Sequence, residues 1–311
     1  MNQFKPQTLC EEYLASMQCE CRTSNFNPFR WNSPAKWTKR EKIDKAKQIA
    51  LELGFKVIDC NCSLLIYPKT LPETAKEEGY VTLISSHADT VPEIETPFVN
   101  SKIANKGTPS ETRYLKGTFD NSITNAVLLS LLHADLPKNT AFVLTGDEET
   151  GRCSGAKQAI NSLERIIDDD VLITAFAMDV TWEGAPDSIL TFENLKKTDE
   201  ELSGIILQMI NEGYPLTCVA TDGFPSSIPK QCRSKRRAMF DEGAAYRQMD
   251  SVSMACSICI PTSGPMHSDA GMIIEAEKLE QYRNAVKSFV WKLRKGILKD
   301  EVLVKTPSPI R

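Results

Sequence analysis

Short apolar and β-branched runs alternate with helical segments along most of this 311-residue chain. The run "YVTLISS" at 80–86 predicts a strand buried on both faces, because it lacks the polar alternation of a half-exposed strand. The apolar segment at 121–136 predicts a helix, and "AFVLT" at 141–145 predicts the next strand. Strands that alternate with helices favour an α/β fold, here a three-layer α/β/α sandwich with a mostly parallel central sheet.

The other expected elements continue this alternation. They are a hairpin at 56–68, strands at 171–178, 188–193, 216–220 and 251–260, and helices at 38–54 (N-cap Thr38), 154–165, 198–214 and 275–298. The stretches 96–113 and 230–237 are expected to be loops, the second a solvated basic one. We therefore expect one domain over residues 1–311, beginning with an irregular segment at 1–40.

Composition and charge exclude several classes of partner. The net charge of −4 and the pI near 5.6 argue against a nucleic acid or an anionic membrane surface. The first residues lack the apolar core of a signal peptide, and no window has the roughly 20 apolar residues of a membrane span. Ten cysteines without an export signal are expected to be reduced thiols of a cytoplasmic protein, and their spacings do not favour a zinc finger.

Histidine and carboxylate side chains follow the predicted strands, at the point where each strand ends. In an open α/β sheet, ligands bind beyond the carboxyl ends of the strands, so these side chains are expected at one edge. The residues are His87 and Asp89, Asp120 after a short extended stretch at 113–119, Asp147 with Glu148 and Glu149, Asp179, and His267. Two of the three histidines belong to this set, whereas His133 lies near the end of an apolar helix and is expected to be structural.

A dinuclear metal site accounts for this collection of side chains. Most loop carboxylates are merely hydrated, but that interpretation would have to hold at five strand ends at once. Imidazole and carboxylate ligands suit Zn²⁺ or a related divalent ion such as cobalt or manganese. A bridging carboxylate holds two such ions about 3.5–4 Å apart. The cations would also offset the repulsion within "DEE" at 147–149.

Two further side chains have expected roles around the metal ions. Asp89 lies two positions after His87, on the same side of an extended chain, where it can orient the imidazole. Only one of Glu148 and Glu149 is needed as a ligand. The other is placed to take a proton from the attacking water and return it to a leaving amine.

Five motifs occur along the chain in a recognisable order: "SHADTVP", "LKGTFDN", "LTGDEETG", "AMDVT" and "IPTSGPMHSDAGMI". As a set covering about residues 43–298, they resemble the co-catalytic di-zinc exopeptidase superfamily. The motifs resemble two branches of this superfamily. One branch contains peptidase T, the glutamate carboxypeptidases and the acetylornithine deacetylases, and the other contains the glutamyl and deblocking aminopeptidases. The resemblance implies metal ligands His87, Asp120, Glu149, Asp179 and His267, with Asp120 bridging the two ions, Glu148 as general base and Asp89 supporting His87.

The chain departs from the pattern of this superfamily at several positions. Ser122 and Thr124 stand where a basic residue and a glycine are usual, and Gly271 stands where a glutamate is common, with Asp269 as a nearby substitute. The superfamily also commonly has a cis peptide after the bridging aspartate. In each branch, an additional domain is inserted between two of the ligands. In this chain, the predicted ligands are too close in sequence to leave room for such a domain. The resemblance therefore implies a catalytic domain without a separate lid or dimerisation domain.

The expected activity is metal-dependent hydrolysis of an amide bond, with a peptide or an acylated amino acid as substrate. An aminopeptidase is the first interpretation, because the lid that usually supplies carboxylate-binding residues is missing. A deacylase or carboxypeptidase with the same site is the enzymatic alternative, and a non-catalytic metal-binding relative is the alternative from another class. The sequence leaves the formation of a homo-oligomer open.

Overall fold

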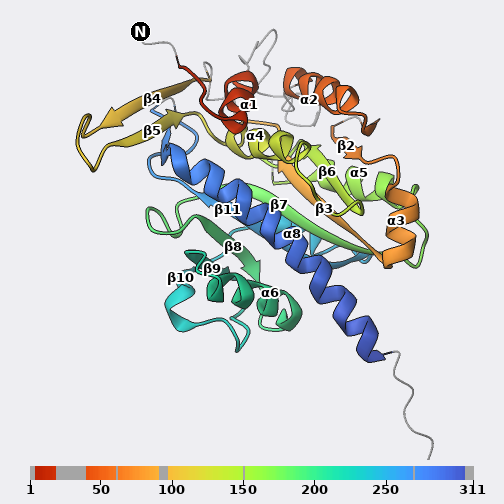
Figure 1. Ribbon diagram of the computed structural model, residues 1–311. Helices are drawn as coiled ribbons and strands as arrows, with labels where there is room; N and C mark the ends of the chain where they lie inside the picture. Colours follow the sequence, from red (N-terminus) through yellow and green to blue (C-terminus); the bar gives the residue numbers. More distant parts are fainter. Residues whose placement is uncertain are drawn as a thin grey trace, which may run out of the picture.

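A nine-stranded sheet forms the centre of the computed structural model, which describes residues 4–18, 40–60, 62–90, 97–149, 151–268 and 270–304. Its strand order is β1-β2-β6-β3-β7-β11-β8-β9-β10 (Figure 1). The strands are β1 (Lys56–Asp59), β2 (Leu64–Tyr67), β3 (Tyr80–His87), β6 (Thr140–Thr145), β7 (Leu172–Thr181), β8 (Leu190–Leu195), β9 (Leu216–Ala220), β10 (Arg233–Arg237) and β11 (Val252–Pro261).

The centre of this sheet is parallel. Strands β6, β3, β7 and β11 pair in parallel, and so do β8, β9 and β10, whereas β8 pairs antiparallel with β11. At the other edge, β1 and β2 form the expected hairpin, and β2 pairs antiparallel with β6. The prediction of a mostly parallel sheet is confirmed.

Helices cover both faces of the sheet and enclose two separate apolar cores, which confirms the three-layer arrangement. One core is built from helices α1, α2, α4, α6 and α8, and the other from α3, α5 and α7. The helices are α1 (Leu9–Met17), α2 (Arg40–Glu52), α3 (Leu71–Glu78), α4 (Ser122–Leu131), α5 (Ser154–Leu163), α6 (Glu200–Asn211), α7 (Glu242–Tyr246) and α8 (Ala276–Val304). In the described part of the chain, no helix combines the length and apolarity that crossing a membrane requires.

The long helix α8 lies across one face of the sheet (Figure 1) and contributes aromatic side chains to the core on that face. Phe289 is fully buried and contacts Phe176 edge-on, with ring centroids 4.9 Å apart, and Phe192 at 5.4 Å. Substituting Phe289→Ala is expected to lower the free energy of unfolding by about 3–5 kcal/mol, because it leaves a cavity that the packed core cannot close. Urea denaturation measures this loss. The half-exposed Phe240 is the control, and a loss for Phe289→Ala as small as that of Phe240→Ala would contradict the packing.

Residues 1–40 are not irregular throughout, because α1 lies within them. The Thr8 hydroxyl accepts a hydrogen bond from the Glu11 backbone N–H at 3.3 Å and caps the helix. Buried Cys10, Leu14 and Met17 belong to the same core as α4. The predicted N-cap of α2, Thr38, lies outside the described residues.

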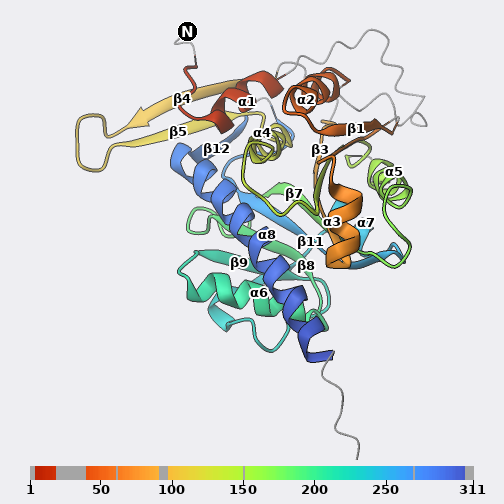
Figure 2. The same cartoon turned by 45° about the vertical axis from the view of Figure 1, so that its right-hand side comes forward.

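Both stretches expected to be loops contain strands. Residues 96–113 contribute β4 (Val99–Ala104) and the start of β5 (Thr112–Gly117), which join β12 (Met272–Glu275) in a small sheet of order β12-β5-β4. The β4–β5 hairpin extends away from the main body (Figure 2). The basic stretch at 230–237 forms a short 3₁₀ turn, Lys230–Cys232, and the edge strand β10, whose last three residues are exposed. The exposure of this stretch was predicted correctly, whereas its strand pairing was not.

Candidate metal centre

Side chains from five separate segments meet at one edge of the central sheet. His87 is the last residue of β3, and Asp179 lies near the carboxyl end of β7. Glu148 and Glu149 follow β6, and the remaining two predicted ligands follow β5 and β11. The structure thus brings together the side chains that the sequence predicts at this edge, including Asp120, which follows β5 of the small sheet. Asp147 is the exception, and its carboxylate accepts a hydrogen bond from Ser154.

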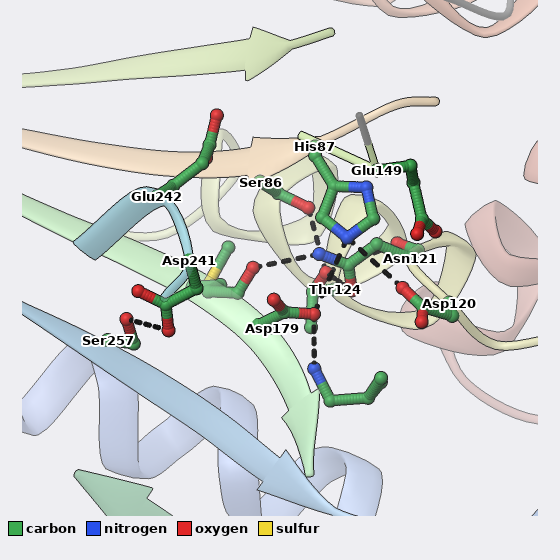
Figure 3. A network of polar contacts seen from close by, with 12 residues as sticks. Ser86, His87, Asp120, Asn121, Thr124, Glu149, Asp179, Asp241, Glu242 and Ser257 are labelled. Carbon is green, nitrogen blue, oxygen red and sulfur yellow. Dashed lines mark hydrogen bonds and ion pairs between the residues drawn. The ribbon is translucent and has the colours of Figure 1, made fainter. Parts of the chain in front are cut away.

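Asp120 lies between the two histidines, and Figure 3 shows its contact with His87. Its Oδ1 is 3.1 Å from His87 Nε2, and its Oδ2 is 2.8 Å from His267 Nε2. His87 Nε2 is also 3.5 Å from Asp179 Oδ1, and His267 Nε2 is 3.4 Å from Glu149 Oε2. A cis peptide joins Asp120 to Asn121, as the resemblance implies.

Three overlapping sets of ligand atoms each lie within 4.8 Å of one another. Two of the sets share Asp120 and are the two that the sequence resemblance implies: His87 with Asp120 and Asp179, and Asp120 with Glu149 and His267. The third set adds Glu148 to His87 and Glu149. One carboxylate therefore presents one oxygen to each of two adjacent ligand groups, which is the arrangement that bridging requires.

In the absence of a cation, burial disfavours the ionised form of most carboxylates of this site. Burial, with the charges of Asp179 and Asp120 nearby, raises the pKa of Glu148 well above its ordinary value. Burial and the charge of Asp120 raise the pKa of Glu149 to about 10, and burial raises that of Asp179. Glu149 Oε1 is buried without a hydrogen-bond partner among the described residues. This donor set fits two divalent ions, which would supply the missing partner and positive charge.

Hydrogen bonding with the histidines has the opposite effect on Asp120. Burial opposes its ionisation, but hydrogen bonds with His267 and His87 outweigh burial, so that its pKa lies below the ordinary value. Burial would lower the pKa of His87, but the charge of Asp179 and the hydrogen bond with Asp120 raise it well above normal. The hydrogen bond with Asp120 likewise raises the pKa of His267.

Asp89 is fully buried behind His87, where the sequence predicts a supporting carboxylate. Its Oδ1 lies 3.4 Å from His87 Nδ1, the ring nitrogen that faces away from Asp120. Its Oδ2 accepts a hydrogen bond from the Glu149 backbone N–H at 3.1 Å. Asp89 therefore connects two of the predicted ligands, one from each ligand group.

The departures from the superfamily pattern have local structural explanations. Ser122 Oγ accepts a hydrogen bond at 3.1 Å from Lys42 Nζ, a buried ammonium group that α2 supplies. Lys42 thus brings a positive charge to the position where a basic residue is usual, and no local sequence pattern indicates this. Thr124 Oγ1 lies 2.7 Å from Ser86 Oγ, so a hydroxyl pair joins α4 to β3 where a glycine is usual.

Gly271 has no room for the glutamate that is common at its position. Its φ is +72°, and a Cβ atom there would lie 2.9 Å from the Gly117 carbonyl oxygen and 2.8 Å from the Phe98 ring. Glycine is therefore required where the chain approaches β5. Asp269, the substitute expected from the sequence, lies outside the described residues.

A cleft of about 420 Å³ opens beside the predicted ligands and continues over β11, β8 and β9. Cys259 and Val219 are buried and Glu193 is partly buried, so these residues form its floor. The half-exposed Trp182 and Phe240 line its mouth. Burial raises the pKa of Glu193 to about 7. Glu193 could not be identified from the sequence, because it is the last residue of the predicted strand 188–193 and does not follow it. The sequence of one strand does not show which residues lie beside it on the neighbouring strands.

Metal binding is expected to release protons near pH 7. Glu148, Glu149 and Asp179 have raised pKa values in the metal-free protein, as do both histidines, and each ligand must lose its proton to bind. The apparent affinity for zinc should therefore fall as the pH falls from about 8 to about 6. Calorimetric titration with zinc in buffers of different ionisation enthalpy measures the protons released. Equal binding enthalpies in all buffers would contradict this linkage.

Several solved structures share this fold. The TET aminopeptidase from the marine sediment archaeon Thaumarchaeota archaeon SCGC AB-539-E09 is 11% identical, with a TM-score of 0.61 over 93% of this chain and 99% of that one. Aminopeptidase APDkam598 from the archaeon Desulfurococcus kamchatkensis is 12% identical, with a TM-score of 0.57 over 88% and 93%. PhTET1-12s, described as a dodecamer, is 11% identical, with a TM-score of 0.52 over 91% and 98%.

No protein-family model matches the sequence, and no curated protein matches it either. At these identities the likeness to solved structures is a likeness of fold. The chain has the fold of these aminopeptidases, which confirms, at the level of the fold, the resemblance to the zinc exopeptidase superfamily.

Proposed function

We propose that this chain, which has the fold of co-catalytic zinc exopeptidases, is an aminopeptidase that uses two divalent metal ions to hydrolyse the first peptide bond of its substrates. The observation that carries the proposal is the position of Asp120, with one carboxylate oxygen beside each histidine and each histidine beside a further carboxylate. A single structural ion would need only one of these two ligand groups.

The proposed ligands are His87 and Asp179 for one ion, Glu149 and His267 for the other, and Asp120 for both. When bound, the ions would supply Lewis-acid polarisation of the scissile carbonyl and of water, and zinc is the ion that this mix of imidazole and carboxylate suits best. Cobalt and manganese are the other divalent ions to test.

Glu148 is the proposed general base. It adjoins His87 and Glu149 but belongs to neither of the two groups that share Asp120. In the metal-free protein its carboxyl group holds a proton tightly, and positive charge in the site would bring its pKa back toward neutrality. A group with such a pKa can take a proton from water and deliver it to the leaving amine. Asp89 would hold the His87 ring in place from behind.

The names of the structural neighbours also support an aminopeptidase over a deacylase or a carboxypeptidase. The dodecamer named for PhTET1-12s supports the proposal that this chain forms a homo-oligomer. We further propose a cytoplasmic enzyme with reduced thiols, since the eight cysteines in the described segments are all free.

Mass spectrometry of a peptide pool tests the reaction type. The pool contains N-blocked, C-blocked and free peptides, incubated with the protein and zinc, cobalt, manganese or a chelator. Metal-dependent removal of N-terminal residues from peptides with a free amine, including the C-blocked ones, is the expected result. Loss of the blocking groups would instead identify a deacylase, and shortening from the C-terminus a carboxypeptidase. No product with any metal would favour the non-catalytic relative.

A further inference from the structure

The cleft beside the predicted ligands has a carboxylate in its floor that the proposed reaction does not use. In the pairing register, Cys259 of β11 is opposite Asp179 of β7, and Ser257 of β11 is opposite Glu193 of β8. Side chains at paired positions, and at every second position along a strand, share one face of a sheet. Glu193 therefore projects from the same face as Asp179, two strands away from it.

Glu193 differs from Asp241 and Glu183, the acidic side chains of the cleft that lie outside the predicted metal centre, in lacking a complete set of partners. Its Oε1 is buried and has no hydrogen-bond partner among the described residues. Asp241, by contrast, accepts hydrogen bonds from Asn194, Ser257 and the Ala244 backbone N–H. Glu183 is paired with Arg236 at 3.1 Å and accepts a hydrogen bond from Ser234. A buried carboxylate oxygen without a partner is destabilised until a donor or a cation reaches it.

Three of the exposed side chains at the entrance of the cleft are apolar. Trp182, Met239 and Phe240 line it and are 50%, 81% and 53% exposed. Apolar groups at the entrance, above a carboxylate, match a side chain with an aliphatic stem and a cationic end, because the stem packs on the apolar groups while the charge reaches the acid.

The distance between the strands indicates which positively charged group of a substrate can reach Glu193. Two strand intervals, roughly 10 Å, separate the backbones of β7 and β8. Glu193 is offset from Asp179 by two residues, roughly 7 Å along the strands, so that roughly 12 Å separates the two residues. The α-ammonium group of a substrate is two bonds from its scissile carbonyl, so it stays close to the ligands on β3 and β7. A lysine side chain reaches about 6 Å from its Cα, given bond lengths near 1.5 Å, and an arginine reaches further. The Glu193 side chain covers the rest of the distance.

We propose that Glu193 determines specificity for substrates whose N-terminal residue is lysine or arginine, by binding the cationic end of that side chain in this cleft. The inference rests on the proposed function for the position of the scissile bond. Arg236 and Arg237 also line the cleft and could instead attract an acidic side chain. Arg236 is already paired with Glu183 and is 71% exposed, and Arg237 is exposed at the sheet edge, so water weakens both charges.

Three versions of one tripeptide, beginning with lysine, norleucine or glutamate, test the proposal in the full-length, zinc-loaded protein. Norleucine has the lysine chain without its ammonium group. Wild-type protein is expected to show a kcat/KM for the lysyl peptide at least about tenfold above that for the norleucyl peptide. Glu193→Gln should remove this preference, a change of about 10- to 100-fold for losing a hydrogen bond to a charged group, and should alter the norleucyl value less than about twofold.

Glu183→Gln is the matched control, because it removes the same charge from the same cleft at a position already paired with Arg236. It should keep the preference for lysine. An equal loss in both variants would overturn the assignment to Glu193 in favour of general electrostatic attraction. Faster hydrolysis of the glutamyl peptide by wild-type protein would also overturn it.

Calorimetric binding of lysinamide and norleucinamide separates this inference from the proposed function. Tighter binding of lysinamide that Glu193→Gln abolishes would support the cleft assignment even if no peptide were hydrolysed, in which case the proposed function would fail alone. Hydrolysis of the norleucyl peptide without any lysine preference would reject the cleft assignment and leave the aminopeptidase in place.

Discussion

Substituting Glu148→Gln is expected to lower kcat for peptide hydrolysis by about 10²–10⁴-fold, the usual contribution of a general acid–base group. The amide has nearly the volume of the carboxylate but cannot accept a proton from water or return one to the leaving amine. Because Glu148 lies outside the two ligand groups that share Asp120, the metal content should stay at about two ions per chain. Steady-state kinetics on a cleaved peptide, together with elemental analysis of the same sample, measures both quantities.

Glu164→Gln is the matched control for this substitution, since Glu164 is exposed at the end of α5. Its kcat should equal that of the wild-type protein. A Glu148→Gln variant with undiminished kcat would reject Glu148 as the base. Loss of metal from that variant would instead identify Glu148 as a ligand. This outcome would agree with the third ligand set, in which Glu148 lies near His87 and Glu149.

Substituting Asp120→Asn is expected to reduce the metal content from about two ions per chain to about one or fewer, because the bridging role needs two anionic oxygens. Asp120 is the one residue shared by both ligand groups, so its loss weakens both. Hydrolysis should fall with the metal content. Elemental analysis after gel filtration measures the loss, and circular dichroism verifies that the variant is folded.

Asp135→Asn, at an exposed position after α4, serves as the control for Asp120→Asn. It should retain the full metal content. Two tightly held ions in Asp120→Asn would show that Asp120 does not bridge them, and the ligand sets would have to be reassigned.

Most of the fold and the gathering of the proposed ligands at one sheet edge could be predicted from local sequence signals, whereas the role of each ligand follows only from the resemblance. The strand β3 is a continuous apolar and β-branched run, and such runs identify strands that are covered on both faces. His87 and Glu149 could be placed together before any coordinates, because the parallel strands β3 and β6 bring the residues at their carboxyl ends to the same edge. Asp179 and His267 could be placed there for the same reason.

The features that could not be predicted depend mostly on contacts between distant segments. Helix α1 is the exception, because Thr8 and Glu11 form a local capping pair from which its start could have been predicted. The Lys42–Ser122 hydrogen bond joins residues 80 positions apart, and no local pattern marks a lysine for burial. Glu193 resembles any other strand residue, and only the register of β8 against β11 gives it a place in the cleft.

The proposed ligands are spread along the chain from His87 to His267, and more than half of the sequence lies between them. The pair of sites that share Asp120 is therefore complete only after β11 has joined the sheet beside β7. A chain still emerging from the ribosome, or one cut before β11, would lack the second histidine and could not assemble the pair. On the proposed function, hydrolytic activity would therefore require a chain that is complete beyond β11.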